Sequence, residues 1–263
     1  MRCGSAPPRA SPGIRATRGI RATGGPAPAE LVAAACPGGA AAAGFADRAA
    51  IPQAHLEAVD CVASRDIARG FADGTYGPAQ AVRRDQMASF IVRTLQAAGV
   101  SLPAPRAQRF VDVAAGSTHD TAIHQLAAAG IVAGGPGGLS ADFYGPDQPI
   151  RRDQMASFLV RAAGYATGSE LTTDQSAGFS DVPAGNVHAA NIDTAAAPGL
   201  AQGRGDGTYG PAAPDPGGVW PARPGRCVRL IATFAYCDVS GAGATVNRCS
   251  GGVGQCSQPR PGR

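Results

Sequence analysis

The sequence has no lysine, one tryptophan and few methionines, so all 23 of its basic residues are arginines. A bias of this kind is common in proteins from GC-rich genomes, which makes the arginine content weak evidence for a nucleic-acid partner. The net charge is only +4, and no dense basic patch alternates with aromatic residues. The composition therefore argues against nucleic-acid binding.

The sequence also lacks the short motifs of common catalytic and metal centres. It has no Gly-x-Ser-x-Gly, no His-Glu-x-x-His and no phosphate-binding loop. Asp-Gly-Thr segments occur, but the alternating oxygen ligands of a calcium loop do not accompany them. We therefore expect a protein that is not an enzyme and that holds no cofactor and no metal.

No apolar run is long enough for a membrane-spanning helix. Near the amino terminus, several arginines precede an alanine-rich stretch, Leu31–Ala43, in the order found in export signals. Cys36, Pro37 and Gly38 interrupt the apolar part of this stretch. A signal peptide is therefore not clearly identifiable.

None of the seven cysteines lies in a Cys-x-x-Cys pair, which argues against zinc-ribbon and thioredoxin-type sites. The last four are Cys227, Cys237, Cys249 and Cys256. They could form two disulfides in an oxidising compartment, or they could be unpaired thiols in a poorly folded tail. The sequence favours neither alternative.

One pattern occurs three times along the chain. Each copy begins with Phe-x-Asp, continues with a histidine and a helix of small residues, and ends in a Tyr-Gly-Pro turn. The starts are Phe45, Phe110 and Phe179, the histidines are His55, His119 and His188, and the turns begin at Tyr76, Tyr144 and Tyr209. The string Arg-Arg-Asp-Gln-Met-Ala-Ser-Phe follows the first two turns, at Arg83–Phe90 and Arg151–Phe158. A repeat places the function on a repeated surface rather than in one unique cluster.

The first half of each repeat is predicted to be a short helix followed by a tight turn. Ile123 and Leu126 share one face of this helix, and Gly130 suits its end, where a positive φ is needed. Asp66 takes the same position in the first repeat, and aspartate tolerates the left-handed region better than most residues. The turn contains Asp-Gly, and its tyrosine is expected to be a buried anchor.

A second helix is expected to begin at each arginine doublet. An apolar stripe follows at helical spacing, formed by Met87, Phe90, Ile91 and Leu95 in one copy and by Met155, Phe158, Leu159 and Ala163 in the other. Asp85 and Asp153 fall in the first turn, where a negative charge suits the helix dipole. Gln86 and Gln154 are placed to reach back to the cap residue.

The third copy loses the pattern from about Ala212, where prolines and glycines exclude a second helix. The segment Val228–Tyr236 could take the place of that helix, because Val228, Ile231 and Phe234 could form an apolar face. Otherwise, the uncovered surface would make the chain less stable or lead it to pair with another copy. The change of pattern, together with the arginine- and proline-rich ends, could also mark a frameshift or a wrong start codon.

These features divide the chain into five segments. A low-complexity segment covers 1–44, repeats cover 45–108 and 109–177, a partial repeat covers 178–211, and an irregular tail covers 212–263. The predicted fold is mainly α, with tandem helix-loop-helix repeats and irregular termini.

The repeats resemble the S-layer homology domain family, which usually has three tandem copies; here the third is truncated. The resemblance rests on Phe110-Val111-Asp112-Val113, on Gly130-Ile131-Val132-Ala133-Gly134 and on Asp73-Gly74-Thr75-Tyr76-Gly77-Pro78. The Arg-Arg-Asp-Gln helix start is similar to the form found in high-GC Gram-positive bacteria. The resemblance implies that the repeats assemble into a pseudo-threefold helical bundle, or spindle.

The resemblance also implies a non-catalytic module that anchors an exported protein at the cell surface. Such modules bind an anionic, often pyruvylated, secondary polysaccharide of the cell wall. The family arginine that contacts the anion aligns with Arg84 and Arg152. A helix amino terminus and a guanidinium both favour an anion. The loops add further expected polysaccharide-binding residues: Asp73, Gly74, Tyr76, Gly203, Asp206 and Gly207.

The chain departs from the family pattern at several positions. Arg83 and Arg151 replace a capping threonine, which predicts a poorer cap, and glutamine replaces the following glutamate. The repeat histidines stand where a tryptophan is common, and we expect them to pack or hydrogen-bond at a helix start rather than bind metal. Arg84 and Arg152 have an alternative role, which is to pair with the aspartate of a neighbouring repeat.

Two other functions stay open at this point. The chain could be a structural protein of a surface layer that self-associates through contacts between repeats. It could also be the anchoring fragment of a larger exported hydrolase whose catalytic domain is not in this sequence.

Overall fold

The structure is a computed structural model that describes residues 36, 38–105, 108–135, 140–197 and 199–214. Within these residues it contains five α-helices and two short 3₁₀ helices, and only isolated β-bridges in place of strands. The prediction of a mainly α fold is therefore confirmed. The pseudo-threefold arrangement stays a prediction, and the segment Val228–Tyr236 and the four cysteines of the tail lie outside the described residues.

Each repeat histidine stands directly before a short helix. These helices are α2 (Leu56–Ser64), α4 (Asp120–Ala128) and α6 (Ala189–Ala196), and the 3₁₀ helices η1 (Arg48–Ala50) and η2 (Gln53–His55) precede α2. The backbone leaves the first two helices in the left-handed region, with φ of 58° at Asp66 and 73° at Gly130. Both residues were expected to take this role, since most other side chains would be strained there.

The longer helices begin at the arginine doublets as predicted. They are α3 (Arg84–Ala97) and α5 (Arg152–Thr167). The side-chain oxygen of Gln86 accepts a hydrogen bond from the N–H of Arg83 at 3.0 Å, and Gln154 accepts one from Arg151 at 3.3 Å. Each glutamine therefore accepts a hydrogen bond from the backbone N–H of the cap residue, which is an arginine here rather than a threonine or serine.

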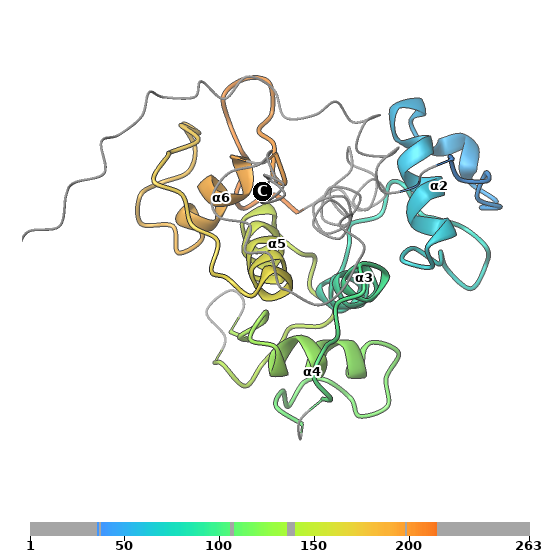
Figure 1. The fold of residues 1–263 in the computed structure, drawn as a ribbon, viewed down its shortest axis with the longest axis horizontal. Coiled ribbons are helices and arrows are strands. Elements are labelled where there is room, and N and C mark those ends of the chain that lie inside the picture. The colour runs from blue at the N-terminus through green and yellow to red at the C-terminus, as the bar shows by residue number, and fades with distance from the viewer. Residues whose placement is uncertain (1–35, 37, 106–107, 136–139, 198, 215–263) are drawn as a thin grey trace, which may run out of the picture.

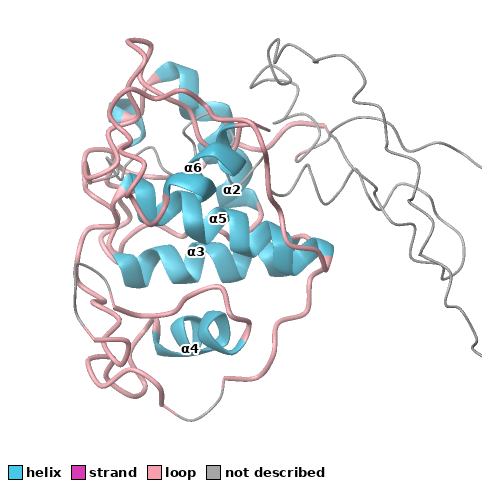
Figure 2. Cartoon of the chain, turned by 90° about the vertical axis from the view of Figure 1, so that its left-hand side faces the viewer, coloured by secondary structure: helices cyan, strands magenta, loops and turns pink. Residues whose placement is uncertain are grey.

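The helices pack across the boundaries of the sequence repeats. α3 of the first repeat packs against α4 of the second, α5 of the second packs against α6 of the third, and α3 and α5 contact each other. Figure 1 shows α3 and α5 near the middle of the molecule with α2, α4 and α6 around them, and Figure 2 shows α3 and α5 running side by side. The unit of packing is therefore the second helix of one repeat with the first helix of the next.

The predicted apolar stripes form the core. Met87, Ile91, Leu95, Met155 and Leu159 are almost completely buried, whereas Phe90 is only partly buried. Burying side chains of this size contributes about 1.5–3 kcal/mol each, so the two stripes stabilise the fold substantially.

A disulfide joins Cys36 to Cys61 on α2. Sequence reasoning missed this pair, because its partners are 25 residues apart and no local motif links them. Next to it, Asp60 forms an ion pair with Arg48 and accepts a hydrogen bond from the N–H of Ala43 at 2.8 Å. The segment before the first repeat is thus held to α2 by a covalent bond and by polar contacts.

Replacing Cys36 or Cys61 with serine should lower the free energy of unfolding by about 3 kcal/mol, because a closed loop of this length restricts the unfolded chain. Denaturant unfolding measures the loss. The two single variants and the double variant should lose the same amount, since each breaks the same bond. Unchanged stability in the double variant would contradict the pairing.

Candidate functional site

The Tyr-Gly-Pro loop of one repeat covers the amino terminus of a helix from the repeat before it. The N–H groups of Arg84 and Asp85 at the start of α3 donate to the carbonyls of Gln148 at 2.9 Å and Pro146 at 3.1 Å. At the start of α5, Arg152 and Asp153 donate to Ala213 and Pro211, both at 3.1 Å. Carbonyls of the next repeat therefore satisfy N–H groups that a free helix end would leave unpaired.

At each of these junctions an arginine and a tyrosine exchange hydrogen bonds. The Nε of Arg84 donates to the carbonyl of Tyr144 at 2.8 Å, and the hydroxyl of Tyr144 donates to the carbonyl of Arg84 at 2.8 Å. The guanidinium also lies 4.8 Å from the centre of the tyrosine ring. Arg152 and Tyr209 repeat the exchange at 2.7 and 2.9 Å, with 4.6 Å to the ring centre.

Both arginines are buried. Arg84 is 3% exposed and Arg152 is 2% exposed. A second nitrogen of Arg84 donates to Gln154 at 3.3 Å, and one of Arg152 donates to the carbonyl of Gln202 at 2.7 Å. Burial lowers the pKa of Arg84, but an arginine pKa is so high that the group keeps its charge. Burial also raises the pKa of the Tyr144 hydroxyl, which therefore remains a donor at any physiological pH.

The aspartate of each Phe-x-Asp start holds the loop of its own repeat. The two carboxylate oxygens of Asp112 accept from the N–H groups of Tyr144 at 2.8 Å and Gly145 at 2.7 Å. Asp47 and Asp181 do the same for the Tyr-Gly pairs that follow them, at 2.7–2.8 Å. The hydrogen bond from the N–H of Tyr209 is the main cause that lowers the pKa of Asp181.

These contacts favour the structural alternative for Arg84 and Arg152. The Nε of each guanidinium donates to a backbone carbonyl of the next repeat, while Asp112 and Asp181 accept from backbone N–H groups. Pairing of these arginines with an aspartate of the neighbouring repeat stays a prediction, and the charge of Asp112 does act on Arg84. Direct contact of either arginine with a polysaccharide stays a prediction.

The Asp-Gly-Thr loops are the exposed members of the predicted site. In the first repeat, one oxygen of Asp73 accepts from the N–H and the hydroxyl of Thr75, at 2.9 and 2.6 Å. Asp206 holds Thr208 in the same way at 2.9 and 2.7 Å. The pKa of both carboxyls is lowered, first by the threonine hydroxyl. Each loop thus presents an ionised carboxylate that uses one of its two oxygens for the hydrogen bonds of the turn.

Glycine has two different reasons to be present in these loops. Gly74 and Gly207 have φ of 79° and 83°, and an added Cβ would meet nothing within 4 Å, so only the backbone conformation requires glycine. At Gly203, an added Cβ would lie 2.5 Å from the ring of Phe179 and 2.9 Å from the carbonyl of Thr208. Gly203 therefore serves packing, whereas the open space around Gly74 and Gly207 would let a ligand approach the backbone.

The predicted residues fall in different surroundings. Tyr76 is buried and its ring lies 5.1 Å from that of Phe45, which confirms it as an anchor. Arg152 bonds to Gln202 beside Gly203, so it belongs to the same junction as the loop that carries Asp206. Arg84 is held instead by the second repeat, apart from the loop of its own repeat.

Two segments of the chain are similar to a known family. Residues 44–88 and 109–156 match the model of the S-layer homology domain. These two segments belong to the S-layer homology family. The third copy lies outside both matched segments, so it stays a prediction, as does the high-GC Gram-positive type.

A relative described as "Cell surface protein" from Thermoanaerobacter kivui is similar to part of this chain. The two are 33% identical over 102 residues, which is 39% of this chain and 13% of the relative. The match therefore covers a small part of the relative's length.

The S-layer homology signature has a physical explanation in these contacts. The Phe-x-Asp start supplies the carboxylate that holds the turn, and its phenylalanine packs against the turn tyrosine, at 5.3 Å between the rings of Phe110 and Tyr144. The arginine of the helix start locks that turn to the preceding repeat.

Two of the three repeat histidines, His119 and His188, hydrogen-bond at helix starts, as predicted. Nδ1 of His119 lies 2.8 Å from the hydroxyl of Ser89, and Nδ1 of His188 lies 2.8 Å from that of Ser157. These serines belong to the repeated Arg-Arg-Asp-Gln-Met-Ala-Ser-Phe string. Its identical sequence in two copies was the feature from which their role could have been predicted. Within the described ranges, no three His, Cys, Asp or Glu residues gather as a metal site would need.

Replacing Tyr144 or Tyr209 with phenylalanine should lower the free energy of unfolding by about 1–2 kcal/mol each, because a buried arginine carbonyl loses its donor. Tyr165→Phe is the matched control, since its hydroxyl makes an exposed bond to the carbonyl of Ser101, at 3.1 Å. Equal effects at all three positions in denaturant unfolding would count against the buried exchange.

The structure also predicts that stability falls in mild acid. Burial lowers the pKa of His119 and His188 from the usual 6.5, against a smaller opposite effect of Asp85 and Asp153. As the pH falls, the histidines of the unfolded chain therefore take up protons before those of the folded chain. Their contribution to the free energy of unfolding is complete above about pH 6.5 and is lost as the pH falls through their folded-state pKa values. Melting temperatures between about pH 7 and pH 5.5 should fall less in the variant with His119→Asn and His188→Asn than in the original chain. Equal falls would show that other groups cause the acid sensitivity.

Proposed function

We propose that this chain is a non-catalytic module that holds an exported protein to the cell wall by binding an anionic wall polysaccharide. The observation that carries the proposal is the pair of S-layer homology segments. Their signature residues fix loops at repeated positions, which suits a polymer with repeating units. The proposal includes a pyruvate ketal as the anionic group, and the chemical composition of the wall tests this part.

A place at the cell surface has two further supports. The Cys36–Cys61 disulfide suits an oxidising compartment outside the cytosol. The similar protein of Thermoanaerobacter kivui is described as a cell surface protein. Among the described residues, no helix is long and apolar enough to cross a membrane.

We assign the direct contacts with sugar hydroxyls to the exposed loops. The carboxylates of Asp73 and Asp206 can accept hydrogen bonds from hydroxyls, and the backbone at Gly74 and Gly207 is open to a sugar ring. Arg84 and Arg152 would act at the anionic groups only if the polymer reached their buried guanidinium groups. Otherwise Arg152 supports binding by fixing the loop that carries Asp206, while Arg84 fixes the middle loop.

The proposal is tested by sedimentation with isolated cell walls. The chain should pellet with walls and should stay in solution when the secondary polysaccharide has been removed from them. Pelleting that survives removal of the polysaccharide would assign the binding to another wall component and contradict the proposal.

The same assay tests the loops. The variant with Asp73→Asn and Asp206→Asn should bind walls about tenfold more weakly, because each loses a charged acceptor. Its fold should be kept, since asparagine can make the same turn. Asp174→Asn, at an exposed aspartate outside the loops, is the matched control and should bind as the original chain does. Equal binding by the loop variant and the control would remove the loops from the site.

A further inference from the structure

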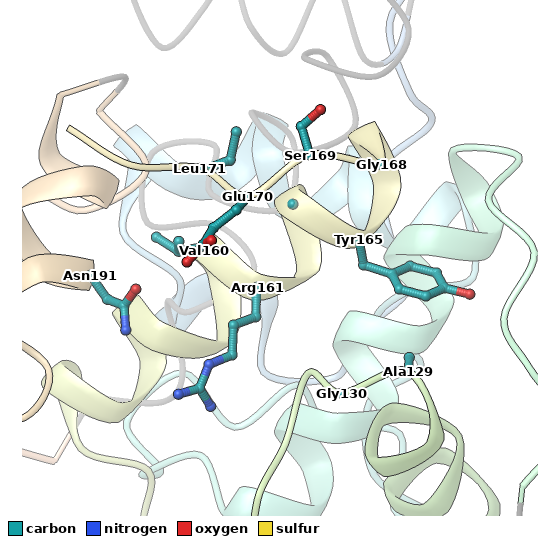
Figure 3. A pocket seen from close by; sticks show the side chains of 11 residues that line it. Ala129, Gly130, Val160, Arg161, Tyr165, Gly168, Ser169, Glu170, Leu171 and Asn191 are labelled. Carbon is teal, nitrogen blue, oxygen red and sulfur yellow. The ribbon is translucent and has the colours of Figure 1, made fainter. Parts of the chain in front are cut away.

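A groove of about 640 Å³ lies where α4 ends, along the second half of α5 and beside the start of α6 (Figure 3). Its lining includes the small residues Ala129 and Gly130, together with Val160. Its size is within the range of small-molecule sites. It is distinct from the Asp-Gly-Thr loops and from the buried arginines of the junctions.

The end of α5 closes one side of this groove. Gly168 has a φ of 66°, and the N–H of Ser169 donates back to the carbonyl of Gly164 at 3.1 Å. The chain therefore turns sharply and brings Glu170 and Leu171 over the helix that it has just left. Gly164 permits this close return, because an added Cβ would lie 2.9 Å from the carbonyl of Ser169.

The polar lining combines donors and acceptors from three elements. Arg161 comes from α5, Asn191 from α6 and Glu170 from the segment after α5. Figure 3 shows the polar ends of these three side chains to one side of the view and the ring of Tyr165 to the other. A guanidinium, an amide and a carboxylate beside apolar lining residues can bind vicinal hydroxyls while the apolar residues meet the C–H face of a sugar ring.

The equivalent position in the first repeat is filled differently. Arg93 donates to the carbonyl of Ile67 at 3.2 Å, as Arg161 does to Ile131 at 3.5 Å. Close to Arg93, however, the side chains of Asp66 and Arg69 form an ion pair, and their charges act on Arg93. Gly130 and Ala133 stand at these two positions in the second repeat, so the space around Arg161 stays open and Arg161 is exposed.

We propose that this groove binds one neutral hexopyranose unit of a glycan, with Arg161, Asn191 and Glu170 as hydrogen-bond partners of its hydroxyls. The opposite charges of Arg161 and Glu170 offset each other, which favours a neutral polyol over an anion. The inference rests on the proposed wall-polysaccharide function and adds a second subsite to it, for a neutral unit of the same polymer.

NMR of the intact chain tests the groove directly. Neutral methyl hexopyranosides and N-acetylhexosamines at high millimolar concentration should shift the amide signals of Gly130, Arg161 and Gly164. Glucuronate and inorganic phosphate serve as anionic comparisons and should shift them less. Absence of shifts with every neutral sugar, or stronger shifts with the anions, would overturn the proposal.

Variants then connect the shifts to the side chains. Arg161→Ala and Asn191→Ala should each weaken the saccharide affinity about tenfold, because each removes polar partners of the sugar. Arg93→Ala is the matched control: it removes the same kind of carbonyl contact on α3 and should leave the affinity within about twofold. Melting curves show whether each variant is folded. Because the two test residues lie on separate helices, the test remains valid if one variant unfolds. Equal affinity for the chain and both groove variants would contradict the assignment.

The outcome separates this inference from the proposed function. If the chain sediments with walls but no saccharide shifts the groove signals, only the groove proposal fails. If the groove binds a saccharide but the chain does not sediment with walls, the wall-anchoring function fails and the groove remains.

Discussion

The exchange of hydrogen bonds between a buried arginine and a tyrosine of the next repeat is the interaction on which the described structure depends. At each junction the guanidinium donates to the tyrosine carbonyl, and the tyrosine hydroxyl donates to the arginine carbonyl. A buried guanidinium without these acceptors would cost several kcal/mol, so the arginine is stable there only while the neighbouring loop is in place. The helix of one repeat and the loop of the next therefore form together.

This dependence links the fold to the proposed function. The third-repeat loop carries Asp206 and Gly207, which we assign to the polysaccharide, and its carbonyls accept the first N–H groups of α5. The middle loop accepts those of α3. The helices α3 and α5 are thus each coupled to the loop of the next repeat along the chain. A polymer with repeating units would meet loops held at fixed positions, which reduces the entropy lost on binding.

Much of the local structure could be predicted, because local signals decide it. Asp66 and Gly130 mark helix ends through their tolerance of positive φ, and Gln86 marks a cap through its position in the first turn. Contacts between distant residues could not be predicted in this way. Three features depend on which segments meet in space: the pairing of Cys36 with Cys61, the packing of α3 on α4 and the burial of Arg84. In addition, the sequence alone cannot distinguish a buried arginine from a surface arginine that binds a ligand.

Hydrogen exchange in the variant with Arg84→Gln tests the central claim most directly. The backbone N–H groups of Tyr144 and Gly145 donate to Asp112, and no atom of residue 84 bonds to them. If the junction forms as one unit, these two amides should lose protection in the variant together with those of Arg84's own position and Asp85 at the start of α3. Loss of protection confined to the start of α3, with Tyr144 and Gly145 exchanging as slowly as before, would contradict the account.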